Sequence, residues 1–303
     1  MSIAISPPRA TLAANLICLA SMLTWAVGLP AAQLIIPLIP PVTLTALRTA
    51  FAAAVLVPLW IMAEGPGPLL SANWGRGIFV GGICIGLGAV LLVIAQARTD
   101  PVTVAVITAI MPVIGIALEV ALDGRRLTWA LIFGLGLSLG GGFMAYGAGM
   151  GSMALGLGAL AAFGSVLAFT WGSRATVTSF PALTPLGRTT VTVTGAAVLM
   201  SVIALIYSAA GGPATQWQAM GPPQWGALLL FGVGSLAISQ VLWIIAVGQL
   251  GIGLSALHMN AVPFYVMLIL FALGGGWNWP QAYGAVIVAI GVLIAQGLIR
   301  LPR

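Results

Sequence analysis

Long apolar runs, each about the length of a membrane-crossing helix, dominate this sequence. A helix needs about 20 mostly apolar residues to cross the hydrocarbon core of a bilayer. Because lipid offers no hydrogen bonds to the backbone, we expect each run to be helical. The sequence therefore predicts an all-α integral membrane protein with ten transmembrane helices. The predicted spans are roughly Leu12–Gln33, Pro41–Met62, Gly75–Ala97, Pro101–Leu122, Thr128–Tyr146, Met153–Ala175, Thr184–Ser208, Pro223–Val247, Gly253–Leu273 and Gln281–Ile299.

The composition agrees with a chain that is solvated by lipid. Charged residues make up 5% of the chain and hydrophobic residues 61%, whereas soluble proteins carry roughly 25% charged residues. The net charge is +6, and the ten basic residues are all arginines scattered between apolar runs. Such scatter does not form a nucleic-acid-binding stripe. Cys18 and Cys84 lie inside apolar runs without metal-ligand spacing, so we expect no metal and no cofactor.

The arginines also predict the orientation of the chain. With ten spans and a cytoplasmic N-terminus, eight of the ten arginines fall in or beside cytoplasmic segments. Arg98 falls on the other side, and Arg48 lies within the second span. Because basic residues concentrate in cytoplasmic loops, we expect a multi-pass protein of the cell (inner) membrane with both termini in the cytoplasm.

A weak internal repeat relates the two halves. Leu91–Gly142 aligns without gaps on Leu242–Leu293, at a shift of 151 residues, with nine identities in 52 positions. The identities include the mid-span prolines Pro112 and Pro263. We predict a first five-helix repeat over residues 1–150 and a second over residues 151–303. Five is odd, so the second repeat enters the membrane in the opposite sense, an arrangement found in secondary transporters.

Around these prolines the sequence resembles a known superfamily. Met111-Pro112 is followed by Gly124-Arg125-Arg126-Leu127-Thr128-Trp129 and then by three glycines, and Val262-Pro263 is followed by Gly275-Gly276-Trp277-Asn278-Trp279. This pattern resembles the drug/metabolite transporter superfamily and, within it, the ten-span group built from two EamA repeats. Family members usually carry a Gly-Glu pair before the last span of each repeat. Arg125 and Gly276 stand at the glutamate positions, which puts a role for that carboxylate in doubt.

Within the superfamily the chain looks most like the aromatic amino-acid exporters. That resemblance implies export of aromatic and other apolar amino acids from the cytoplasm by alternating access, through a cavity between the repeats. The bilayer and a small-molecule substrate are then the expected partners. An exporter of drugs or other small metabolites, and a non-transporting membrane scaffold, are the alternatives. We do not expect an enzyme, because one histidine and four carboxylates without Ser/His or metal-ligand spacing offer no catalytic set.

Polar side chains within spans are costly and mark candidate sites. His258 and Asn260 lie near the middle of the ninth span, just before Pro263, and Gln240 lies inside the eighth. They are predicted to line the substrate path, where an imidazole could meet a carboxylate or carry a proton. The alternative for each is an interhelical hydrogen bond that holds the packing.

Three tryptophans lie deeper than the interfacial belt that tryptophan usually forms. Trp25 and Trp171 occupy comparable places in the first spans of the two halves, although Phe169 aligns equally well with Trp25. Trp243 lies in the eighth span. We predict that these three indoles bind substrate, because aromatic faces stack on aromatic rings and attract ammonium groups.

Prolines within spans are candidate hinges. Pro30, Pro112 and Pro263 each remove a backbone hydrogen bond and should kink their helices. Pro112 and Pro263 are each about ten residues into a span, close to the bilayer midplane at about 1.5 Å per residue. Paired kinks at one depth would suit alternating access, and a purely static bend is the alternative.

Overall fold

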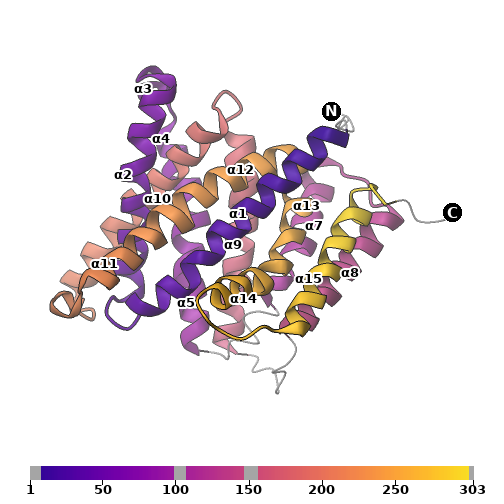
Figure 1. The fold of residues 1–303 in the computed structure, drawn as a ribbon. Coiled ribbons are helices and arrows are strands. Elements are labelled where there is room, and N and C mark those ends of the chain that lie inside the picture. Colours follow the sequence, from indigo (N-terminus) through magenta and orange to yellow (C-terminus); the bar gives the residue numbers. More distant parts are fainter. Residues whose placement is uncertain (1–7, 99–106, 147–155, 300–303) are drawn as a thin grey trace.

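The computed structural model describes residues 8–98, 107–146 and 156–299, and these residues form helices joined by short loops (Figure 1). No strand occurs within those three segments. The helices are α1 (Pro8–Ile35), α2 (Pro41–Glu64), α3 (Gly67–Ser71), α4 (Trp74–Gly81), α5 (Gly88–Arg98), α7 (Met111–Asp123), α8 (Trp129–Tyr146), α9 (Leu157–Ser179), α10 (Pro185–Ala209), α11 (Pro222–Leu229), α12 (Ser239–Leu250), α13 (Ile252–Leu257), α14 (Val262–Ala272) and α15 (Trp279–Ala295). The π segments are η1 (Gly82–Leu87) and η4 (Leu230–Ile238), and the 3₁₀ segments are η3 (Trp217–Ala219) and η5 (His258–Ala261).

The prediction of an all-helical membrane protein is confirmed. Within the described residues, six helices are long and apolar enough to cross a bilayer, and two shorter apolar helices join them. The six are Thr11–Ile35, Pro41–Glu64, Trp74–Ala95, Pro185–Ala209, Pro222–Leu250 and Ile252–Ala272, and the two are Trp129–Met144 and Trp279–Ala295. Helices α7 and α9 complete the ten predicted positions.

Local sequence signals explain where the helices begin and end. Helix α2 starts at Pro41, where the missing N–H costs nothing because the first helical N–H groups have no partner. Asn278 accepts a hydrogen bond from the Gln281 backbone N–H (3.2 Å) and so caps α15. Gly124 ends α7 at a positive φ of 68°, which glycine adopts without steric cost.

Three predicted spans are helical throughout but change helix type along their length. The third is α4–η1–α5, the eighth is α11–η4–α12, and the ninth is α13–η5–α14. The two π segments occupy matching places in the halves, since Gly82–Leu87 shifted by 151 residues falls inside Leu230–Ile238. A π turn contains one residue more than an α turn. The spacing of apolar residues does not reveal such an extra residue in a run that is apolar throughout, so the sequence did not predict the two π segments.

The three prolines lie in different local settings. Pro30 lies inside α1. Pro112 and Pro263 are each the second residue of a helix, α7 and α14. The backbone before Pro263 is helical as well, since η5 leads directly into α14 and Ile252–Ala272 forms one span. The role of the three prolines as hinges stays a prediction.

The start of α1 and the end of α15 lie on one face of the bundle. Asn15 near the start of α1 and Gln296 at the end of α15 exchange two side-chain hydrogen bonds, each 2.7 Å long. Figure 1 shows the start of α1 and the end of α15 at the same side of the bundle. We call this side the terminal face and the other side the opposite face. An even number of spans requires this arrangement; which face meets the cytoplasm remains a prediction.

Contacts between the halves occur in matched pairs. From α1, Ser21 donates to the Ser239 carbonyl (2.8 Å), and from α9, Ser165 donates to the Gly88 carbonyl (2.7 Å). The two carbonyls are 151 residues apart, and the two donors are 144 residues apart.

A second pair follows the same rule at the next turn. Ser235 donates to the Trp25 carbonyl (3.0 Å), and the Cys84 thiol donates to the Phe169 carbonyl (3.6 Å). Ser235 again lies 151 residues after Cys84, and Phe169 again lies 144 residues after Trp25. An inverted repeat produces such pairs, which supports the predicted division into halves. The boundary at residue 150 lies outside the described residues.

Candidate functional site

Four aromatic side chains belong to or pack against one buried core. Trp243 is 1% exposed and belongs to the buried core, and Trp25, Phe169 and Tyr265 are half-buried and pack against the same core. They come from α12, α1, α9 and α14, and thus from both halves. We call these four residues the aromatic cluster. Cys18, Met22 and Met111 complete its apolar surroundings.

Trp243 is held rigidly within the aromatic cluster. Its indole N–H donates a 2.9 Å hydrogen bond to the Ser173 hydroxyl, and both groups are buried. Its ring stacks on Phe169 with centroids 6.0 Å apart and planes inclined by 28°. Since Ser173 satisfies the only polar atom of the indole, Trp243 is buried without an unpaired donor.

Gln240 provides a polar group one turn away on the same helix. It is 4% exposed and lies three residues before Trp243, so the two side chains share a face of α12. Its amide Nε2 is buried and has no hydrogen-bond partner among the described residues. An unpaired buried donor is costly. Gln240 therefore suits an acceptor supplied by a ligand.

His258 and Asn260 are also buried, at 4% and 1% exposure, but they face neighbouring backbone and side chains. His258 Nδ1 lies 3.2 Å from the Leu254 carbonyl, one turn earlier in its own segment. Asn260 donates to the Ser138 hydroxyl of α8 (3.1 Å) and packs against Gly142. These contacts fit the alternative in which both residues hold the packing. Their predicted role in substrate binding stays a prediction.

Trp171 lies apart from the other two candidate tryptophans. Its ring meets Phe79 edge-on, with centroids 6.0 Å apart, and Phe79 is 60% exposed. The matched contacts instead pair Trp25 with Phe169, the second of the two alignments that the sequence allowed. Among the described residues, Phe169 and not Trp171 packs against the aromatic cluster.

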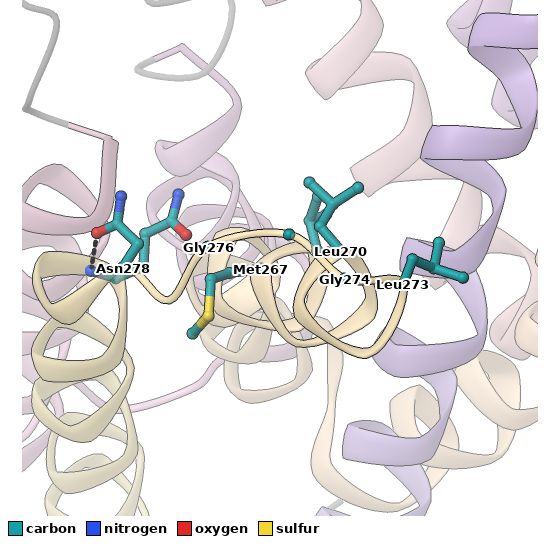
Figure 2. Close-up of a pocket in the computed structure, with 9 residues that line it drawn as sticks. Met267, Leu270, Leu273, Gly274, Gly276 and Asn278 are labelled. Carbon is teal, nitrogen blue, oxygen red and sulfur yellow. Dashed lines mark hydrogen bonds between the residues drawn. The ribbon is translucent and has the colours of Figure 1, made fainter.

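A cavity of about 520 Å³ lies at the junction of α14 and α15 (Figure 2). It is lined by apolar side chains of α14, the loop Gly274–Gly276, Asn278 and Gln281. Val266 lines the cavity and also packs against the core around Trp243, but none of the four residues of the aromatic cluster lines it. Ligand pockets typically enclose roughly 300–1,000 Å³.

Sequence reasoning missed three residues of this region. Tyr265 lies two positions after Pro263, in the helix that follows η5, and the apolar pattern of its span does not mark it. Ser173 is one of many small residues in its span, and nothing marks it as the partner of Trp243. Asn15 could have been found, because an amide within the first apolar run is itself a signal.

Comparisons with known proteins point to transport. Residues 12–147 match the EamA-like transporter family. An uncharacterized transporter of Bacillus subtilis (strain 168), YyaM, is 32% identical over 120 residues, which are 40% of this chain and 38% of that protein. The chain thus matches well under half of the length of this relative. The family match over residues 12–147 agrees with the superfamily resemblance, and both matches are to transporters rather than enzymes.

The fold is shared by a solved structure. A crystal structure of another protein superposes with a TM-score of 0.79 at 22% identity, over 95% of this chain and 98% of the other. At this identity the match concerns the fold alone. It extends over both halves, whereas the family match covers the first.

Proposed function

We propose that this chain, EamA-like over residues 12–147, is a secondary transporter that exports aromatic and other apolar amino acids from the cytoplasm. The observation that carries the proposal is the aromatic cluster with the unpartnered Gln240 amide beside it. The cluster draws on both halves, as a site between two repeats must.

The chemistry of the cluster fits a zwitterion with an apolar side chain. The half-buried rings of Trp25 and Phe169 offer faces to an aromatic or aliphatic side chain, and Trp243 stacks on Phe169. The Gln240 amide can donate to a carboxylate, and an aromatic face can receive an ammonium group.

Movement between the halves needs elements that can turn. Pro112 and Pro263 start helices at equivalent places, and each adjoins the core around Trp243 through Met111 or Val262. In the proposed cycle α7 and α14 pivot at these two prolines, while Pro30 bends α1. A proline at such a position lets the chain change direction without breaking a hydrogen bond that the helix would otherwise make.

Export of drugs or other small metabolites is the second candidate. It is favoured by the many apolar side chains that pack around Trp243, among them Met22 and Met111. A neutral apolar compound would need only the ring faces. Gln240 distinguishes the two candidates, because its amide is of use only to a substrate with a hydrogen-bond acceptor.

Uptake into liposomes that hold only the purified protein tests the proposal. Labelled tryptophan, phenylalanine, threonine and a cationic dye are supplied with and without a pH gradient. We expect the aromatic amino acids to enter and the dye to stay outside. Gln240→Leu should slow amino-acid uptake about tenfold, since a hydrogen bond to a charged group is worth roughly 1.5–3 kcal/mol. Entry of the dye alone, or no uptake at all, contradicts the proposal.

Substitution of two tryptophans, one inside and one outside the aromatic cluster, tests whether the cluster binds substrate. Trp25→Ala removes a ring from the aromatic cluster and should lower amino-acid uptake about tenfold. Trp171→Ala removes an equally half-buried ring that packs on Phe79 instead, and uptake should stay within about twofold of the wild type. Initial rates at equal amounts of reconstituted protein provide the comparison. Equal losses in both variants would remove the cluster from the transport path.

A further inference from the structure

A reciprocal amide pair ties the first helix to the last on the terminal face. Asn15 Nδ2 donates to Gln296 Oε1, and Gln296 Nε2 donates to Asn15 Oδ1, each at 2.7 Å. Asn15 is 7% exposed, and its Nδ2 also donates to the Thr11 carbonyl (2.9 Å). All four side-chain polar atoms of the pair are thus satisfied within the protein. If the two amides separate, each can form hydrogen bonds with water in place of those with its partner.

The pair lies directly below the aromatic cluster along α1. Asn15, Cys18, Met22 and Trp25 follow each other at spacings of three and four residues, so they form one stripe of this helix. Trp25 belongs to the aromatic cluster, and Cys18 and Met22 belong to the core around Trp243. At about 1.5 Å per residue, Asn15 lies roughly 15 Å nearer the terminal face than Trp25.

Burial changes along this stripe. Toward the terminal face the path is filled: Cys18 and Ser255 are 0% exposed, Ile252 is 1% exposed, and the Cys18 thiol lies 3.6 Å from the Ser255 carbonyl. Further out, Trp25, Phe169 and Tyr265 are half-buried. The region between the aromatic cluster and the terminal face is therefore closed in this conformation.

A second tie closes the same face. The buried carboxylate of Glu119 on α7 pairs with Arg125 and accepts a 3.2 Å hydrogen bond from the Gly253 backbone N–H of α13. Asp123 at the end of α7 pairs with Arg174 of α9. These ties join α7 of the first half to α13 and α9 of the second, just as Asn15 and Gln296 join α1 to α15.

We propose that Asn15 and Gln296 form the latch of a gate on the terminal face. In the conformation described here the gate is closed, and a substrate can reach the aromatic cluster from that face only after the two amides separate. The inference rests on the proposed transport function. It adds the positions that control entry, which are distinct from the residues proposed to bind substrate.

The native cysteines supply a direct test. Cys18 lies one turn above Asn15 on the same stripe, and Cys84 is buried elsewhere, against Gly172. In a Cys84→Ala background, Asn15→Leu and Gln296→Leu should each raise the rate at which a membrane-impermeant maleimide labels Cys18 by about tenfold. In a Cys18→Ala background the same substitutions should leave the labelling of Cys84 unchanged. The double variant should match either single variant, because both remove one shared interaction.

The outcomes separate the gate from the transport function. Unchanged Cys18 labelling in both variants overturns the gate, and so does a parallel rise at Cys84, which would indicate general loosening. If Cys18 labelling responds as expected while no tested compound is transported, the gate stands and the proposed function falls.

A cross-link tests the latch without weakening the protein. Asn15→Cys and Gln296→Cys are combined with Cys18→Ala and Cys84→Ala, so that only the new pair can form a disulfide. Oxidation should stop uptake into liposomes, and reduction should restore it. Uptake that continues unchanged after complete cross-linking contradicts the gate, because the two positions would then not need to separate.

Discussion

Replacing Gly134 with alanine is expected to destabilise the protein strongly, although it adds a single methyl group. A Cβ at Gly134 would lie 2.4 Å from the Gly291 carbonyl oxygen and 2.5 Å from the Ala295 backbone nitrogen. Both atoms belong to α15, so no side chain can turn away to make room. Overpacking of this kind typically costs about 1–3 kcal/mol, and we expect the upper end of that range. Thermal unfolding in detergent, followed by tryptophan fluorescence, measures the effect.

Gly136, two residues along α8, is the matched control. A Cβ there meets nothing within 4 Å, and the residue is exposed. Gly136→Ala should leave the unfolding temperature unchanged or raise it, since alanine favours the helix over glycine by roughly 1 kcal/mol. Gly291→Ala, which brings a Cβ to 2.6 Å from the Gly134 carbonyl oxygen, should repeat the loss. Equal unfolding temperatures for Gly134→Ala and Gly136→Ala would show that α8 and α15 do not pack as described.

Glu119→Leu should be the most damaging change among the charged residues. The Glu119 side chain is 7% exposed and that of its partner Arg125 is 17% exposed. The substitution leaves a guanidinium without its anion and the Gly253 N–H without its acceptor. Removing one partner of a buried pair typically costs about 3–5 kcal/mol. The free energy of unfolding, measured by denaturant titration in detergent, should fall by about that amount.

The second ion pair of the terminal face provides the contrast. Asp123 is 35% exposed and its partner Arg174 is 18% exposed, so water screens this pair. Asp123→Asn should therefore cost about 1 kcal/mol or less. Glu119→Leu combined with Arg125→Leu should recover part of the loss, because no charge then remains unpaired. If Glu119→Leu costs no more than Asp123→Asn, the Glu119 carboxylate is not the tie between α7 and α13 that the structure describes.

The apolar runs predicted the helices well, because hydropathy and length alone decide whether a segment can cross a membrane. The changes of helix type within the runs could not be predicted in the same way. The sequence of η4 is as apolar as the sequences that flank it. The segment packs against α1 and α2, where Gly232 approaches the Arg48 backbone closely, and such contacts between distant residues are not visible in a local apolar pattern. Pro263 marks the place in the ninth span where the 3₁₀ segment η5 gives way to α14.

The candidate site was predicted in part. Depth in a span distinguished Trp25 and Trp243 from interfacial tryptophans, and both belong to the aromatic cluster. Depth could not distinguish Trp171 from Phe169, because the two residues lie two positions apart in the same span. Which of them is equivalent to Trp25 depends on the number of residues by which the two halves are shifted in the alignment. That shift is 144 residues for the α1 and α9 contacts and 151 for those of η1 and η4. A single ungapped alignment cannot represent both values.

The two π segments determine where this chain can change its length. Deleting one residue from an ordinary α-helix turns everything beyond it by about 100°, because each turn holds about 3.6 residues. A π turn already holds one residue more than an α turn over the same rise. A deletion within Gly82–Leu87 or Leu230–Ile238 would be absorbed as a plain α-helix, so that α5 or α12 would keep the same face toward the centre of the bundle. Each half therefore has one place where it can lose a residue without rotating the helix that follows.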